Sequence, residues 1–276
     1  PGIMFALNAL GVIYSRIHQT KKAVENLENA LKMARAVNDK KPHVTLPQIL
    51  KNMGKALLLH GKLDESLSYF VEAKEIMDKL LGPNHLHPLT SRIFCNTGEN
   101  YLMLGDVLKA RQYFENAFKM NCEIYGENSN GGHMEGVCSL LALTLKKMGS
   151  NAEAMEYYTK AIKIAKKIPL TKDNCCMVIH NLYDLAMTCL IFEQQYEAFK
   201  HLVEARKIAK ETSYEDWTVV YVLVALLQTY AKMPFNLECL ICYLDARKIA
   251  RNLPQEVSHP YSILEMLKIM KIGPRS

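Results

Sequence analysis

The chain has 276 residues, of which 49% are hydrophobic and 22% are charged, so it can bury a core and is not intrinsically disordered. Its net charge of +6 is scattered rather than gathered in basic blocks, which argues against a nucleic-acid partner. No apolar run reaches the roughly 18 to 20 residues that span a bilayer, so we expect no membrane insertion. Eight cysteines without disulfide-like spacing favour a reducing, cytoplasmic location.

Apolar residues recur every three or four positions from residue 4 onward, which predicts helices throughout and no strand. Short turns join the helices in pairs, and loops that contain proline or glycine separate the pairs. In chain order, we predict helix pairs at 4–17 with 20–37, 46–60 with 63–81, 89–104 with 107–125, 133–148 with 151–168, 174–191 with 194–211, and 216–232 with 235–252. A last helix at about 259–270 is expected to cap the array.

One pattern of small and large residues repeats along these pairs. Its first position is Gly11, Gly54, Gly98, Ala142, Ala186 and Leu227, in steps of 43, 44, 44, 44 and 41 residues. Glycine inside a helix costs about 1 kcal/mol relative to alanine, so the glycine must serve packing. We predict that the second helix of the third pair, through Ala110 and Ala117, packs closely on the first helix at Gly98.

This pattern resembles the tetratricopeptide repeat, a helix–turn–helix unit with a small residue and an aromatic in helix A, and small, aromatic and small positions in helix B. The resemblance covers about residues 4–253, and the extra length of each unit and the loop LLGPNHLHPLT look like the kinesin-light-chain-like long-repeat subtype. It implies an all-α, right-handed superhelical solenoid of six helix pairs plus a C-terminal capping helix. The implied repeats are about 4–43, 44–88, 89–132, 133–172, 173–214 and 215–253.

The resemblance also implies that residues 1–276 form a single solenoid domain. Because the chain begins with Pro1 and the helical pattern starts almost at once, we expect it to be a fragment of a larger protein.

Motifs for metal binding or catalysis are weak in this chain. Cys239 and Cys242 have the spacing of zinc ligands, but they lie in the middle of a predicted helix without a second pair, so we expect core packing. His85 and His87 are expected to form a solvated turn and a helix start. No phosphate-binding loop or nucleophile motif is present. We therefore expect no enzymatic activity, no metal and no cofactor.

In the family, the A helices line a concave groove, and an asparagine two residues before the glycine holds the backbone of a bound peptide. Asn52 and Asn96 occupy that position, and an amide offers both a donor and an acceptor. Lys51, Lys55 and Arg92 would place three positive charges around them, which suggests a partner with acidic side chains or a free carboxylate; a plain solvated face is the alternative. We expect both asparagines to face solvent when the groove is empty. The predicted peptide-binding residues are Asn8, Lys51, Asn52, Lys55, Arg92, Asn96 and Glu99.

Two functions remain open from the sequence. The first is a protein-interaction module, an adaptor or scaffold that binds an extended, acidic peptide segment of a partner in its concave groove. The second is an intramolecular sensor or autoinhibitory domain of a larger multidomain regulatory protein. The full-length sequence would separate them, while the partner and the oligomeric state cannot be read from these residues.

Overall fold

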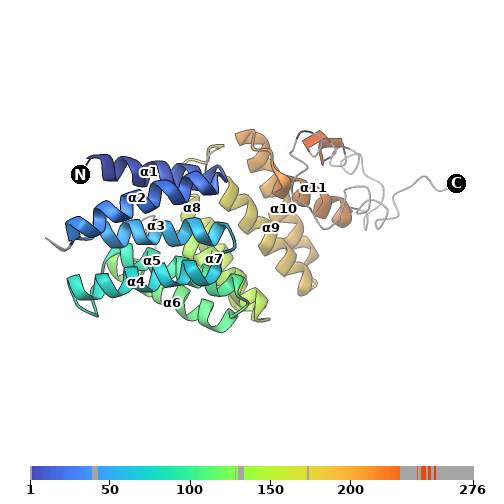
Figure 1. The fold of residues 1–276 in the computed structure, drawn as a ribbon. Helices are drawn as coiled ribbons and strands as arrows, with labels where there is room; N and C mark the ends of the chain where they lie inside the picture. Colours follow the sequence, from blue (N-terminus) through green and yellow to red (C-terminus); the bar gives the residue numbers. More distant parts are fainter. Residues whose placement is uncertain are drawn as a thin grey trace. The chain divides into compact units, whose positions relative to one another are not determined.

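The chain is helical across the residues that the computed structural model describes, which are 2–38, 43–127, 129, 134–172, 174–230, 241, 244–246, 248, 249 and 252. These residues contain no strand. The helices follow one another as in Figure 1: α1 (Gly2–Arg16), α2 (Thr20–Asn38), α3 (Thr45–Leu59), α4 (Leu63–Leu81), α5 (Pro88–Met103), α6 (Val107–Tyr125), α7 (Met134–Lys147), α8 (Asn151–Ala165), α9 (Cys176–Ile191), α10 (Gln195–Thr212) and α11 (Trp217–Tyr230).

The predicted helix pairs are confirmed for this part of the chain, because every observed boundary lies within three residues of the predicted one. Odd-numbered helices are the A helices of the pairs and even-numbered helices are the B helices. The predicted capping helix at 259–270, most of the predicted helix at 235–252, and Cys239 and Cys242 lie outside the described residues.

The chain divides into two compact units, residues 1–148 and 149–276, and the boundary falls in the turn between α7 and α8. In the N-terminal unit α1, α3 and α5 each pack on the B helix of their own pair, and α3, α5 and α7 each pack on the B helix of the preceding pair. Successive A helices also contact one another, from α1 to α3, α3 to α5 and α5 to α7.

Gly98 lies where a side chain of helix B of its own pair rests directly against helix A. A Cβ atom built on Gly98 would lie 2.7 Å from Cε1 of Phe114, a side chain that is fully buried. A Cβ atom on Gly54 would likewise lie 2.5 Å from Cε1 of Phe70, which belongs to the B helix of that pair. The predicted close approach is therefore present, but the atoms nearest to Gly98 belong to the Phe114 ring rather than to Ala110 or Ala117.

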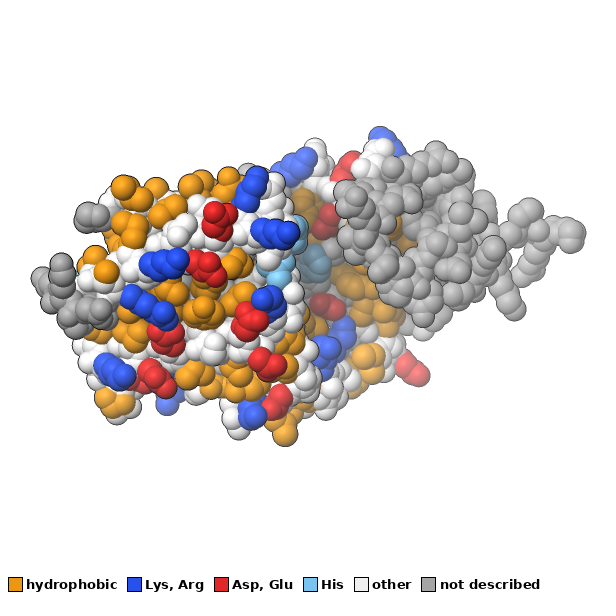
Figure 2. Space-filling view, in the orientation of Figure 1, with side chains coloured by type: hydrophobic (Ala, Val, Ile, Leu, Met, Phe, Trp, Pro, Cys, Tyr) orange, Lys and Arg blue, Asp and Glu red, His pale blue; other side chains and the backbone are white. Residues whose placement is uncertain are grey.

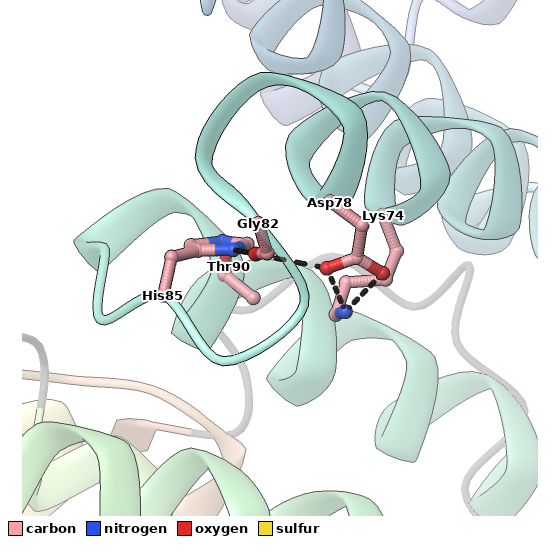
Figure 3. A network of polar contacts seen from close by, with 5 residues as sticks. All are labelled: Lys74, Asp78, Gly82, His85 and Thr90. Carbon is pink, nitrogen blue, oxygen red and sulfur yellow. Dashed lines mark hydrogen bonds and ion pairs between the residues drawn. The ribbon is translucent and has the colours of Figure 1, made fainter.

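A buried histidine fixes the loop between α4 and α5 (Figure 3). The side chain of His85 is only 6% exposed, its Nδ1 donates to the carbonyl oxygen of Gly82 at 2.5 Å, and its Nε2 lies 2.6 Å from Oγ1 of Thr90. Nδ1 also lies 3.7 Å from a carboxylate oxygen of Asp78, which Lys74 contacts at 2.6 Å. The end of α4 and the start of α5 are thus tied together through one imidazole.

The two loop histidines differ from the expectation in one respect. His87 has the expected helix-start role, because its Nδ1 accepts a hydrogen bond from the backbone N–H of Leu89 at the start of α5. The expectation of a solvated turn was wrong for His85, since its side chain is only 6% exposed and contacts Gly82 and Thr90.

Replacing His85 by alanine is expected to lower the free energy of unfolding by roughly 1–3 kcal/mol, because two hydrogen bonds of a nearly buried side chain are lost. Urea denaturation followed by circular dichroism measures this. Asn84→Ala changes an exposed residue of the same loop and should stay within about 0.5 kcal/mol. Equal stabilities of the two variants would contradict a structural role for His85.

Candidate functional site

The predicted peptide-binding residues lie on three successive A helices of the N-terminal unit. Contacts between side chains 44 residues apart, one repeat length, bring several of them together. They are Asn8 on α1, Lys51, Asn52 and Lys55 on α3, and Arg92, Asn96 and Glu99 on α5.

An amide pair joins α1 to α3. Nδ2 of Asn52 donates to Oδ1 of Asn8 at 2.8 Å, and Asn52 is 9% exposed. The expectation that the amides of Asn52 and Asn96 both face solvent was therefore wrong for Asn52, because the close approach of the A helices lets it reach its neighbour. Asn96 is half-buried and makes no hydrogen bond within the described residues. In this pair the side-chain amide hydrogens of Asn8 and the side-chain oxygen of Asn52 are not used, so they can bind a peptide group.

An ion pair joins α3 to α5. Nζ of Lys55 contacts Oε2 of Glu99, and both side chains are partly exposed. Glu99 therefore largely neutralises the charge of Lys55, so Lys55 does not offer a further positive charge to an anion. Of the three positive charges that the sequence predicts around the asparagines, Lys51 is the one that suits that role best.

Lys51 is the most unusual group of this site. It is 8% exposed, and within the described part of the chain it makes no hydrogen bond or ion pair. Burial, followed by the positive charges of Arg92 and Lys55, lowers its pKa from 10.5 to about 8. An ammonium group that ends a largely buried side chain, has no acidic partner and lies among positive neighbours forms a place where an anion would be stabilised.

Cys95 lies on the same helix as Arg92 and Asn96, between them, and is not a nucleophile. Burial and then the negative charge of Glu99 raise the pKa of its thiol to about 12, so the thiol stays protonated and unreactive. In the described parts of the chain, no group of three His, Cys, Asp or Glu side chains is placed to hold a metal ion. The arrangement of this site suits non-covalent binding.

Among the described helices, none combines the length and the apolar character needed to cross a membrane.

Sequence reasoning placed these residues on the A helices, as the structure does, but missed how they meet. It did not predict the burial of Lys51, the Asn8–Asn52 hydrogen bond or the pairing of Lys55 with Glu99. The repeat length holds a signal for the last two, because both pairs are 44 residues apart. Residues one repeat apart occupy the same place on neighbouring A helices and can therefore face each other.

Comparison with family models identifies the repeats. One tetratricopeptide-repeat model matches residues 45–123, and a second matches residues 6–37 and 136–168. The matched segments together cover just over half of the chain and include the helices of the candidate site. The chain is a tetratricopeptide-repeat protein. A model of anaphase-promoting complex subunit 5 matches residues 170–233 of this tetratricopeptide-repeat protein, and a search of curated proteins found no match.

Solved structures of other proteins share the fold of this tetratricopeptide-repeat protein. BtubC (BKLC) from P. vanneervenii is 16% identical with a TM-score of 0.70, over 88% of this chain and 97% of that one. A putative kinesin light chain from Podospora anserina is 20% identical with a TM-score of 0.58, over 75% and 96% of the two chains. A signal transduction ATPase with numerous domains and a tetratricopeptide repeat sensor, from Pyrococcus horikoshii, is 18% identical with a TM-score of 0.68, over 89% and 36%.

Proposed function

We propose that this protein is a non-enzymatic interaction module that holds an extended peptide segment of a partner, with an acidic group, across α1, α3 and α5. The tetratricopeptide-repeat fold itself supports a protein-interaction or scaffold role. The observation that carries the finer proposal is the ammonium group of Lys51, which ends a largely buried side chain beside Arg92 and pairs with no anion among the described residues. A site that keeps such a charge without an internal anion is suited to a ligand that brings one.

The peptide backbone is held by the amides. Asn8 and Asn52 together present a donor and an acceptor, and Asn96 presents both on the next A helix. Packed helices lie roughly 8 to 10 Å apart, and an extended chain rises about 3.3 Å per residue. About three peptide residues therefore separate the contacts with α3 and α5, and a carboxylate between them lies within reach of Lys51 and Arg92.

The first experiment selects ligands from a random-peptide display library on the purified chain and measures their affinity by isothermal titration calorimetry. Replacing both Asn52 and Asn96 by alanine is expected to weaken binding by about 1–2 kcal/mol for each lost contact. Asn29→Ala, an exposed asparagine on α2, serves as the control and should bind as wild type does. Because Asn52 is buried, a melting curve must show that the double variant is folded at the assay temperature.

The outcomes separate the parts of the proposal. Undiminished binding by the double variant would remove α3 and α5 from the binding surface. Selected peptides that bind through the asparagines but lack Asp, Glu and a required terminal carboxylate would contradict the acidic preference and leave the interaction function standing.

A second candidate function is an intramolecular sensor or autoinhibitory domain of a larger regulatory protein. It is supported by the likeness to the Pyrococcus horikoshii ATPase, whose repeats are described as a sensor and of which this chain covers 36%. In that case the acidic segment would come from the same polypeptide. Cross-linking mass spectrometry of the full-length protein tests this candidate, and intramolecular links from α3 and α5 to an acidic segment would favour it.

A further inference from the structure

A cavity of about 210 Å³ lies in the C-terminal unit, where α10 ends and α11 begins. Its walls come from the last turns of α10, from residues 213–215 that follow, from α11 and from a helical segment around Asp245. Ser213, at the end of α10, has a left-handed backbone with φ of 53°, which ends the helix and lets the chain turn toward α11. We call this space the α10–α11 cavity.

The α10–α11 cavity has an apolar floor and a charged mouth. The apolar side chains that line it are at most 9% exposed, and they are Ala209, Val219, Leu223 and Ile249. The charged residues Lys210, Glu215 and Lys248 also line it but are exposed, so they lie where it opens to solvent. Cavities that bind small molecules combine mostly apolar walls with a few polar groups that fix the orientation of the ligand.

Positive charge is in excess around this cavity. Three basic side chains line it, those of Arg206, Lys210 and Lys248, against the two acidic side chains of Asp245 and Glu215. Nη2 of Arg206 and Nζ of Lys210 both contact the same carboxylate oxygen of Asp245, each at 3.2 Å. Lys248 has no acidic partner among the described residues. One carboxylate cannot neutralise two cations, so a carboxylate that a ligand brings would be stabilised here.

Other ion pairs between successive B helices match one base to one acid. Arg35 of α2 pairs with Glu72 of α4. Lys166, directly after α8, pairs with Glu204 of α10. On the face of the N-terminal unit that Figure 2 shows, basic side chains likewise lie beside acidic ones. The sharing of Asp245 by two basic side chains therefore departs from the pattern of the earlier repeats.

We propose that the α10–α11 cavity binds a small carboxylate ligand that carries an apolar group. The carboxylate contacts Lys210 and Lys248 at the mouth, and the apolar group lies against Val219 and Leu223 on the floor. An apolar cavity of roughly 150 Å³ holds benzene, so this larger one has room for a branched aliphatic group.

Two sources share this ligand chemistry, a free acid or amino acid and the C-terminal residue of a peptide. Glu215 separates them, because it lines the same cavity and has no basic partner among the described residues. Its carboxylate can hold the ammonium group of a free amino acid, which a residue inside a peptide lacks.

This site is separate from the proposed peptide site. α1, α3 and α5 belong to the N-terminal unit, whereas every residue that lines the cavity belongs to the C-terminal unit. Lys51→Met should therefore leave binding in the cavity unchanged, and either proposal can fail while the other stands.

The probes are 4-methylpentanoate, leucine, N-acetyl-leucine and N-acetyl-leucinamide, which share one apolar group, together with acetate. Isothermal titration calorimetry with the whole chain is expected to show saturable binding of an acid at one equivalent. The amide lacks the carboxylate and acetate lacks the apolar group, so each should bind at least tenfold more weakly. Tightest binding of leucine or 4-methylpentanoate would identify a free ligand, and tightest binding of N-acetyl-leucine would identify a peptide terminus.

Variants test the charged mouth and the apolar floor separately. Replacing both Lys210 and Lys248 by glutamine should weaken binding at least tenfold, and both residues are exposed, so the fold should be kept. Lys207→Gln is the matched control, because Lys207 lies on the same helix, is 71% exposed and does not line the cavity. Ala209→Leu places an isopropyl group in the cavity and should abolish binding, with a melting curve to show that the variant is folded.

The proposal is overturned if no acid binds saturably, or if N-acetyl-leucinamide binds as tightly as N-acetyl-leucine. It is also overturned if the Lys210→Gln/Lys248→Gln variant binds as wild type does. A folded Ala209→Leu variant with undiminished binding would place the acid on the surface and would overturn the cavity as the site. Should Ala209→Leu fail to fold, the two lysine substitutions and the amide decide the outcome.

Discussion

Replacing Gly98 by leucine is expected to lower the free energy of unfolding by about 1–3 kcal/mol or more. The first added atom, Cβ, would already lie 2.7 Å from the Phe114 ring, closer than van der Waals contact allows. Phe114 is fully buried, so its ring cannot turn toward solvent to make room. α5 and α6 would have to move apart, and the contacts between them would be lost. Thermal and urea denaturation of the variant measure the loss.

The chain offers a matched control for this effect. Gly136 also lies inside an A helix, α7, but a Cβ atom there would meet nothing within 4 Å. Gly136→Ala should therefore stabilise the protein by up to about 1 kcal/mol, since alanine is the better helix former. Gly98→Ala should destabilise it. If the two alanine variants changed stability in the same direction and by the same amount, the close approach at Gly98 would not be a feature of the folded protein.

Replacing Lys51 by methionine is expected to raise the free energy of unfolding by about 3 kcal/mol at pH 7. The pKa of Lys51 is lowered from 10.5 to about 8, mainly by burial and then by Arg92 and Lys55. At pH 7 folding therefore moves a charged ammonium group into surroundings where it is less stable than in water. Methionine fills a similar volume without the charge. Lys21→Met on the exposed face of α2 is the control and should change stability by less than about 0.5 kcal/mol.

The extra stability of the Lys51→Met variant depends on pH, and the lowered pKa of Lys51 sets the direction of that dependence. Between pH 8 and 10.5 the unfolded chain binds more protons at Lys51 than the folded chain does, so the stability of the wild type rises with pH across this window. The advantage of the variant is present in full below pH 8 and disappears as the pH approaches 10.5. Urea titrations at pH 7 and pH 10 test this, and an advantage that is equal at both values would show that the ammonium charge is not its cause.

The same substitution should weaken the binding of acidic peptides. A variant that is more stable and binds less well would indicate that Lys51 is kept for a ligand at the expense of stability. A variant that is more stable and binds equally well would mean that the anion sits elsewhere.

The sequence by itself determined the helices and their pairing. Apolar periodicity and turn residues are local properties, so α4 and α6 begin and end where the pattern predicts. The 44-residue step also identified the glycines as packing positions, because a residue that weakens a helix and returns at the same place in several units must serve a contact between helices. These features belong to single repeats or to the comparison of one repeat with the next along the chain.

Only the tertiary structure decided how the repeats meet. The distance between neighbouring A helices is set by packing across the whole pair, and it determines that Asn52 reaches Asn8, that Lys55 meets Glu99 and that Lys51 is buried. Ile3, Leu10 and Ile13 of α1 read in sequence like the buried faces of α3 and α7, and they are exposed because no B helix among the described residues covers that face. Periodicity records which face of a helix is apolar, whereas burial depends on whether another helix covers that face.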